Sequence, residues 1–279
     1  MNIFRTIKEY KDWQESLTDK TSVGFVPTMG FLHQGHISLV SASMAENDVT
    51  IVSIFVNPTQ FNNPEDLEKY PRNEERDLQM LEMAGTTAVL IPSVSEMYPE
   101  PVTRTWTFPG LDDVMEGAKR PGHFNGVAMV VSELFRIIQP NIAYFGKKDY
   151  QQLMIIRQLA ANDFPQITIK GMPIVREVDG LALSSRNSRL TPEEREMAPL
   201  IFEVLKRARQ LIHEFSPEDV CIHCERMLAG SGMIQPEYFI IADAQTLKPL
   251  SKKEDATHAT AFVAAWLGKV RLIDNFELF

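Results

Sequence analysis

Two histidines, His33 and His36, stand three residues apart in the stretch TMGFLHQGH, directly after the apolar run VGFVP. Imidazole nitrogens can ligate a metal, donate to phosphate oxygens or transfer protons near neutral pH, and histidines on the first turn of a surface helix need no function at all. The pattern predicts a glycine turn and then a helix from about Gly35, whose first N–H groups and dipole would attract an anion. We therefore favour a phosphate site, in which the two imidazoles stabilise charge that develops on a transferring phosphoryl group.

A zinc site is the weaker interpretation, because zinc needs a third protein ligand and no paired His, Cys or Glu motif follows at suggestive spacing. Cys221 and Cys224 have the C-x-x-C spacing of half a zinc knuckle or of a redox pair. They lie in SPEDVCIHCERMLAG, whose periodicity is helical, so we interpret them as two ordinary helix residues. Neither G-x-x-x-x-G-K-[ST] nor G-x-G-x-x-G occurs, so a nucleotide would have to be held in another way.

Two more polar motifs come earlier in the chain than the cysteines. In SIFVNPTQF, the amides of Asn57 and Gln60 carry both donors and acceptors, which suits a ligand with hydroxyl and carboxylate groups. Asn-Pro is also a common turn, and for Asn57 that explanation is equally good. RPGHFNGV, residues 120–127, places a cation, a histidine and two glycines ahead of a helical pattern.

The last two motifs are FGKKDYQQL and DGLALSSRNSRL. Lys148 and Asp149 could together hold a phosphate and either a ribose or a metal-bound water, although such a turn is often solvated surface. Ser184, Ser185 and Arg186 offer hydroxyls and a guanidinium, which form a natural clamp for a triphosphate. Each motif is weak alone, but together they support one another.

Apolar runs and helical patterns alternate through the first 175 residues, so most motifs follow a predicted strand. The runs VGFVP, VTIVSIFV, AVLIP, IAYFG and ITIKGMPIV read as buried strands, with helices at about 35–46, 74–84, 127–138 and 150–160. This order predicts an α/β fold with a Rossmann-like, doubly wound parallel sheet over residues 1–174. Ligands bind such sheets at the carboxyl ends of the strands, where these motifs stand.

Residues 175–279 predict a smaller α+β domain that closes over the active site. A helix capped by Thr191 is expected through TPEEREMAPLIFEVLKRARQLIHEF, and a second helix at about 219–228. The runs YFIIADA, TAFVAAWLG and VRLIDNFEL then read as strands.

The composition excludes several classes of protein. The 279 residues are 44% hydrophobic and carry a formal charge of −9, and no strongly basic stretch occurs, so we expect no nucleic-acid partner. No run of 18 uncharged apolar residues occurs and the first residues are polar, so we expect no membrane association and a cytoplasmic protein. Two cysteines fit a reducing compartment.

The motifs VPTMGFLHQGH, SIFVNPTQF, RPGHFNGV, FGKKDYQQL and GLALSSRN, in this order, resemble the pantothenate synthetase family, the pantoate–β-alanine ligases. HQGH is similar to the H-x-G-H signature of the wider nucleotidylyltransferase superfamily, and the likeness resumes in AAWLGKVRLIDN. The resemblance implies that ATP activates (R)-pantoate as an adenylate with release of pyrophosphate. β-Alanine then displaces AMP, so no protein nucleophile is needed. It also implies Mg²⁺ and a homodimer.

The resemblance further implies the role of each site residue. The catalytic set would be His33, His36, Lys148, Ser184, Ser185 and Arg186, with His36 the candidate proton donor. ATP contacts would come from Met29, Gly30, Phe31, Leu32, His33, Gln34, Gly35, His36, Gly146, Lys147, Lys148, Asp149, the main chain at Val175, Leu183, Ser184, Ser185 and Arg186. Pantoate would meet Asn57, Gln60 and Gln152, with Gln60 also near β-alanine. Met29, Phe61, Val130 and Val131 would form an apolar wall, unless they are ordinary core, and Asp77 is the candidate for the Mg²⁺ shell.

One departure and two alternatives accompany the resemblance. The family commonly has Glu where Lys147 stands, which adds positive charge near the nucleotide. Another H-x-G-H adenylyltransferase, acting on a phosphate acceptor, is the alternative enzyme, but such an acceptor would demand extra Arg or Lys where NPTQF offers amides. A nucleotide-binding regulator or zinc module without turnover is the alternative outside enzymes, and it would leave His36 replaceable.

Overall fold

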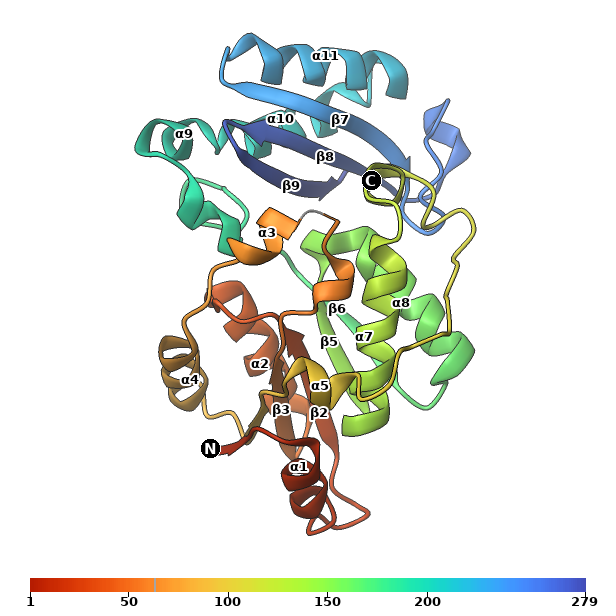
Figure 1. Cartoon of the computed structure of the whole chain (residues 1–279). Helices are drawn as coiled ribbons and strands as arrows, with labels where there is room; N and C mark the ends of the chain where they lie inside the picture. Colours follow the sequence, from red (N-terminus) through yellow and green to blue (C-terminus); the bar gives the residue numbers. More distant parts are fainter. Residues whose placement is uncertain (63) are drawn as a thin grey trace. The chain divides into compact units, whose positions relative to one another are not determined.

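The computed structural model describes residues 1–62 and 64–279, which divide into two compact units (Figure 1). The first unit contains Met1–Lys147 and Gln152–Pro173, and the second contains Lys148–Gln151 and Ile174–Phe279. Each unit has its own core of buried apolar side chains.

The first unit is built on a six-stranded sheet in which every pairing is parallel. The strands lie in the order β1 (Asn2–Phe4), β4 (Ala88–Leu90), β3 (Val49–Ile54), β2 (Val23–Thr28), β5 (Ile142–Gly146) and β6 (Thr168–Met172). The chain progresses from β2 toward β3 on one side and later toward β5 on the other, so the switch point lies between β2 and β5. This confirms the predicted doubly wound α/β fold, and the carboxyl ends of β2 and β5 are where such a fold binds ligands.

Both faces of the central strands β4, β3, β2 and β5 are mostly buried, which explains the continuous apolar runs in the sequence. Neighbouring residues of a strand point to opposite faces, and Phe25 and Val26 accordingly belong to two different core clusters. Helices α1 (Ile7–Gln14), α7 (His123–Ile138) and α8 (Tyr150–Asp163) contribute to the cluster of Phe25. Helices α2 (Gln34–Glu46) and α4 (Glu74–Met83) contribute to the cluster of Val26.

Short elements complete the first unit: α3 (Pro64–Glu68), α5 (Val94–Met97), α6 (Met115–Lys119) and the 3₁₀ turn at Pro58–Gln60, while the 3₁₀ turn Lys147–Asp149 begins in the first unit and ends in the second. Helix α7 begins four residues before the predicted start at residue 127. Gly122, with a φ of 80°, occupies its N-cap, a left-handed conformation that glycine adopts without strain.

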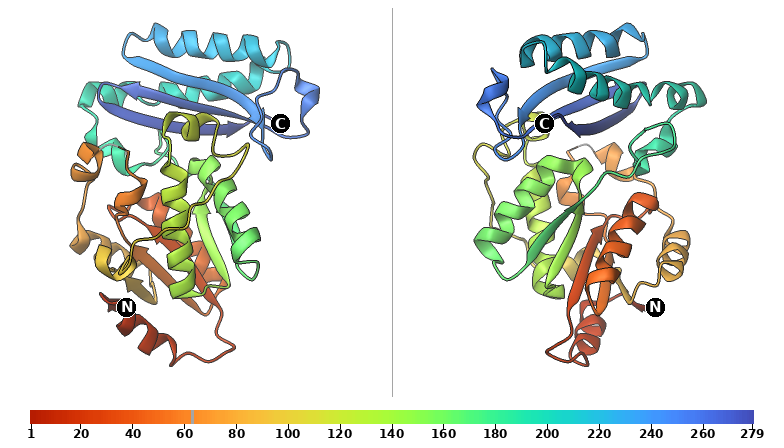
Figure 2. Two further views of the ribbon diagram at one scale, coloured as in Figure 1. Left: turned by 45° about the vertical axis from the view of Figure 1, so that its right-hand side comes forward. Right: turned by 180° about the vertical axis from the view of Figure 1, so that it is seen from behind.

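The second unit contains an antiparallel sheet of β7 (Ile234–Asp243), β8 (Ala259–Leu267) and β9 (Val270–Glu277). Helices α10 (Leu200–Leu211) and α11 (Pro217–Gly230) pack against it, as the teal and blue ribbons of Figure 2 show. The short 3₁₀ helices Ser185–Arg189 and Lys253–Asp255 complete the unit. The three strand predictions are confirmed.

One prediction for the second unit is wrong. The expected single helix after Thr191 is two helices, α9 (Pro192–Met197) and α10, separated at Ala198 and Pro199. Proline lacks the N–H that a helix interior needs, and its ring clashes with the carbonyl one turn earlier. The predicted cap is correct, since the Thr191 hydroxyl accepts from the N–H of Glu194.

Cys221 and Cys224 lie on α11, which confirms the prediction that they are helix residues. Burial raises the pKa of Cys221 to about 11 and that of Cys224 to about 12, so both thiols stay protonated at neutral pH. Across residues 1–62 and 64–279, no helix has the length and apolar character needed to cross a membrane.

Candidate active site

The loop after β2 makes a turn with two residues in the left-handed conformation just before the two histidines. Gly30 and Phe31 have φ values of 79° and 50°, and the left-handed conformation of Phe31 costs roughly 1–2 kcal/mol because a Cβ is present. The buried carboxylate of Asp77, on α4, accepts the N–H groups of Phe31 and Leu32, each at 2.7 Å. Asp77 therefore holds the loop in the shape that delivers His33 to the start of α2.

His33 and His36 form a reciprocal cap at the N-terminus of α2. The Nδ1 atom of His33 accepts from the N–H of Gly35 at 3.1 Å, and the Nδ1 atom of His36 accepts from the N–H of His33 at 3.3 Å. The two ring centroids are 4.1 Å apart. Because each Nδ1 accepts, each imidazole carries its proton on Nε2. The helix terminus thus presents two Nε2–H donors on rings fixed by their own backbone.

Asp77 was the candidate for a metal shell, and its contacts support a different role. Both carboxylate oxygens are engaged by backbone N–H groups. Burial raises the pKa of Asp77, while the two N–H donors oppose this by stabilising the carboxylate. Within the described part of the chain, no group of three or more His, Cys, Asp or Glu side chains could hold a metal ion. A metal role for Asp77 remains a prediction that these contacts do not support.

Replacing Asp77 with alanine should lower the free energy of unfolding by about 1–3 kcal/mol, because the buried N–H of Leu32 and the half-buried N–H of Phe31 lose their acceptors. Denaturant unfolding of the purified variant measures this. Glu75→Ala is the matched control on the same helix, since Glu75 is exposed, and it should change stability by less than about 0.5 kcal/mol. Equal stability of the two variants would contradict the anchoring role of Asp77.

Asn57 and Gln60 lie in the turn after β3, and Asn57 is fully engaged within the protein. Its Oδ1 accepts from the Tyr98 hydroxyl at 3.0 Å and from the hydroxyl and N–H of Thr59. Its Nδ2 donates to the carbonyl of Gly126 at 3.0 Å and to Oε1 of Gln60 at 3.3 Å. Asn57 therefore positions Gln60, and its direct contact with a ligand stays a prediction.

Gln60 is itself held at both its side chain and its backbone. Its Nε2 donates to Sδ of Met29 at 3.0 Å, and its backbone carbonyl accepts from Nδ1 of His123 at 2.8 Å. Arg120 lies 3.1 Å from Nε2 of His123, and because an arginine only donates, that nitrogen is the acceptor and Nδ1 carries the proton. The motif RPGHFNGV thus has a defined task, which is to fix the turn that carries Gln60.

The same motif needs glycine at position 126 for a steric reason. A Cβ on Gly126 would lie 2.4 Å from the carbonyl oxygen of Thr59 and 2.9 Å from Cα of Gln60, both backbone atoms that cannot swing away. Helix α7 therefore approaches the Asn57–Gln60 turn directly, backbone against backbone.

Tyr98 is a residue of this site that sequence reasoning missed, because it stands in no recognisable motif. Burial raises the pKa of Tyr98 to about 12, so its hydroxyl remains protonated and donates to Asn57 at neutral pH. Its ring also packs edge-on against Phe55, with centroids 6.1 Å apart.

The four residues predicted to form an apolar wall differ in how deeply they are buried. Val130 and Val131 are 7% and 4% exposed and belong to the core cluster of α7, which favours the ordinary core explanation. Met29 and Phe61 are half-buried, and Phe61 packs against Tyr70 with ring centroids 5.7 Å apart. Gln152 is half-buried on α8. Their contacts with a substrate stay predictions.

The remaining ATP candidates lie at and beyond the end of β5. Gly146 closes β5 and Lys147 follows it in a 3₁₀ turn, both within the first unit. Lys148 and Asp149 belong to the second unit, where Nζ of Lys148 lies 3.9 Å from Oδ1 of Asp149. That distance is at the long end of an ion pair, and Lys148 also acts electrostatically on the buried carboxylate of Asp274.

The second unit also holds the hydroxyl-rich candidates. The N–H of Leu183 donates to the carbonyl of Val175 at 3.0 Å, which closes a short hairpin between two predicted ATP-binding positions. Ser184 caps the following 3₁₀ helix by accepting the N–H of Arg186 at 3.2 Å. Ser184, Ser185 and Arg186 are therefore presented together, at the start of one helical turn.

Comparison with known proteins gives concordant results. The family model described as "Pantoate-beta-alanine ligase" matches residues 2–277. Pantothenate synthetase from Porphyromonas gingivalis is 46% identical over 278 residues, and that from Bacteroides thetaiotaomicron is 47% identical over 281 residues, each alignment covering 99% of both chains.

Solved structures agree with the sequence matches. Pantothenate synthetase from Thermus thermophilus is 42% identical, with a TM-score of 0.93 and complete coverage of both chains. The pantoate–β-alanine ligase from Francisella tularensis, solved with β-γ ATP and β-alanine, is 39% identical, with a TM-score of 0.85 over 100% of this chain and 98% of that one. The resemblance seen in the motifs is confirmed, and the chain belongs to the pantoate–β-alanine ligase family.

Proposed function

We propose that this protein condenses (R)-pantoate with β-alanine with consumption of ATP, forming pantothenate, AMP and pyrophosphate. Membership of the family supports the overall reaction. The observation that carries the chemistry is the reciprocal histidine cap, which presents two Nε2–H donors at the N-terminus of α2, next to the switch point of the sheet. A helix terminus with fixed donors is suited to the negative charge of a phosphoryl group in transfer.

The reaction proceeds in two balanced steps. A carboxylate oxygen of pantoate attacks the α-phosphorus of ATP, and the bond from that phosphorus to the bridging oxygen breaks as pyrophosphate leaves. The amine of β-alanine then attacks the acyl carbon of the adenylate, loses a proton and expels AMP. An acyl adenylate already has a good leaving group, which is why no Ser–His or Cys–His pair is required.

In this proposal His33 and His36 donate to the phosphate oxygens as charge builds on them. Lys148 and the group Ser184, Ser185 and Arg186 are the proposed phosphate ligands of the second unit, because ammonium, hydroxyl and guanidinium donors all suit a phosphate oxygen. Gln60 binds pantoate through a neutral amide, which its support by Asn57 and His123 keeps in one orientation. The backbone at Met29–Leu32, Gly146 and Val175 contributes the remaining nucleotide contacts.

We propose that Mg²⁺ would be coordinated by the triphosphate of ATP rather than by a set of protein ligands. The described residues offer no three-ligand cluster, and the best single candidate, Asp77, is occupied by backbone N–H groups. When bound to ATP, the ion supplies neutralisation of phosphate charge. A cytoplasmic location, expected from the composition, and a homodimer, implied by the family resemblance, are likewise proposals.

The test is to mix the protein with ATP, Mg²⁺ and pantoate and to measure pyrophosphate release with and without pantoate. We expect release only when pantoate is present, and pantothenate with AMP after β-alanine is added. Release that is equal without pantoate, or that occurs only with a phosphate-bearing acceptor, would contradict the proposal. The second outcome would instead assign the alternative adenylyltransferase activity.

A further inference from the structure

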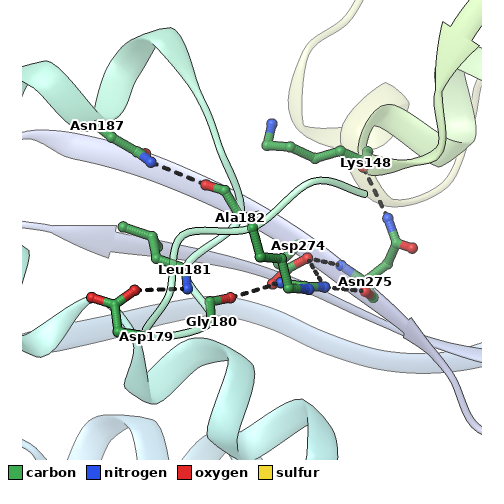
Figure 3. A network of polar contacts seen from close by, with 9 residues as sticks. Lys148, Asp179, Gly180, Leu181, Ala182, Asn187, Asp274 and Asn275 are labelled. Carbon is green, nitrogen blue, oxygen red and sulfur yellow. Dashed lines mark hydrogen bonds and ion pairs between the residues drawn. The ribbon is translucent and has the colours of Figure 1, made fainter. Parts of the chain in front are cut away.

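A buried ion pair in the second unit joins the hairpin after Ile174 to the last strand of the sheet (Figure 3). Nη1 and Nη2 of Arg176 donate to the two carboxylate oxygens of Asp274, at 2.6 and 3.0 Å. The two side chains are 16% and 4% exposed. Because burial removes water from both charges, an ion pair of this kind adds little net stability. Its role is better explained as fixing the position of the hairpin relative to the strand.

The Arg176 side of the pair fixes the hairpin. Its guanidinium also donates to the carbonyl oxygens of Gly180, at 3.1 Å, and Asn275, at 3.2 Å, and it lies 3.8 Å from the ring centroid of Phe202. Arg176 directly follows Val175 and pairs across the hairpin with Ala182. The planar fork of one side chain therefore sets the position of the whole turn that leads to Leu183 and Ser184.

The strand side of the pair extends to the lysine turn. The N–H of Asn275 donates to Oδ1 of Asp274 at 2.8 Å, and its Nδ2 donates to the carbonyl oxygen of Lys148 at 2.9 Å. Asn275 is 6% exposed, so this last bond is shielded from water. In Figure 3, dashed lines run from Lys148 to Asn275, from Asn275 to Asp274, and on from Asp274 to Gly180 of the hairpin through the guanidinium between them.

We propose that Arg176, Asp274 and Asn275 form a positioning network that fixes Lys148 and the Val175–Ser184 hairpin relative to each other for binding of the ATP phosphates. The proposal rests on the proposed function, which makes Lys148 and Ser184 phosphate ligands. None of the three network residues needs to contact ATP. They act by holding the backbone of the phosphate ligands Lys148 and Ser184. Two segments that lie well apart in the sequence are thereby kept in one fixed arrangement.

The same sheet offers a matched control pair, formed between two of its own strands. Arg271 on β9 and Glu237 on β7 form an ion pair at 2.6 Å whose side chains are 16% and 21% exposed. Glu237→Gln therefore removes an equivalent charge contact from the same sheet. If burying a charge pair only stabilises the second unit, this variant and a network variant should behave alike.

The experiment uses Asn275→Ala, which deletes the bond to Lys148 and leaves the ion pair in place, together with Asp274→Asn and the control Glu237→Gln. Rates of pantoate-dependent pyrophosphate release are measured against ATP and against pantoate, and hydrogen exchange is followed over residues 148–151 in the protein without ligand. We expect kcat/KM for ATP to fall by up to about 100-fold in the two network variants, the scale on which small misplacements reduce catalysis. KM for pantoate and the kinetics of Glu237→Gln should stay unchanged.

Exchange over residues 148–151 should be faster in Asn275→Ala than in the wild-type protein and unaffected in Glu237→Gln. Unchanged exchange and unchanged ATP kinetics in Asn275→Ala would overturn the proposal, as would equal losses in Asn275→Ala and Glu237→Gln. A wild-type protein that releases no pyrophosphate with pantoate would refute the proposed function instead. Exchange would then still decide whether Asn275 orders the Lys148 turn.

Discussion

Replacing His36 with alanine is expected to abolish pantoate-dependent pyrophosphate release while leaving the fold intact. Loss of one donor that stabilises charge in a transition state costs about 3 kcal/mol or more, which is a rate loss of at least about 100-fold. The same change removes the acceptor for the N–H of His33, a capping contact worth about 1 kcal/mol of stability. Steady-state kinetics and denaturant unfolding measure the two effects separately.

Two further variants separate the cap from the chemistry. Asparagine at position 36 keeps an acceptor near the place of Nδ1 but has no donor at the place of Nε2, so we expect a stable and inactive protein. Glutamine reaches the place of Nε2 and should recover part of the rate. An asparagine variant with wild-type turnover would show that His36 only caps α2, and the phosphate role would have to be abandoned.

Replacing Lys148 with alanine is the second change with a large expected effect. We predict that kcat/KM for ATP falls roughly 100- to 1,000-fold, the range seen when one preorganised charge-stabilising donor is deleted. The side chain is 18% exposed and its Nζ lies 3.9 Å from a carboxylate oxygen of Asp149, so a bound phosphate would compete with that carboxylate for the lysine charge. Rates measured over a series of ATP concentrations test this.

The neighbouring lysine gives the comparison. Lys147→Glu installs the residue that the family commonly has at this place, and it should reduce kcat/KM for ATP much less than Lys148→Ala. Lys148→Arg keeps the charge but replaces a compact ammonium with a planar fork, so partial activity is expected. A larger loss at Lys147 than at Lys148 would reverse the assignment of the phosphate ligand.

Much of the fold was predictable from the sequence because its signals are local. A strand buried on both faces must be apolar at nearly every position, and β2 and β3 show this directly. The motif at His33 and His36 was also readable, since a turn, a helix start and two imidazoles are consecutive in the chain. Pro199 shows the limit, because a single residue ended a helix whose apolar periodicity continued across it.

The roles of individual polar residues depended on contacts between distant positions. The sequence left Asn57 open between a substrate contact and a turn, and in the structure its amide is bonded to Tyr98 and Gly126, which are 41 and 69 residues away. Asp77 was a candidate for the Mg²⁺ shell through the resemblance, and in the structure both of its oxygens accept N–H groups from a loop about 45 residues earlier. An amide or a carboxylate is the same residue in the sequence whether it contacts a ligand or bonds to the protein's own backbone. The sequence pattern therefore could not distinguish these two roles.

By itself, then, the sequence determined the α/β class, the strand-end location of the motifs and the family, because each depends on order and spacing along the chain. Only the tertiary structure decided which polar side chains are bound to distant parts of the chain and hold them in place. Asn275 and Lys148 are 127 residues apart and share no pattern, yet folding brings an amide donor of one to the carbonyl of the other. Burial favours that hydrogen bond, because a buried polar group without a partner would lose its bonds to water and gain none from the protein.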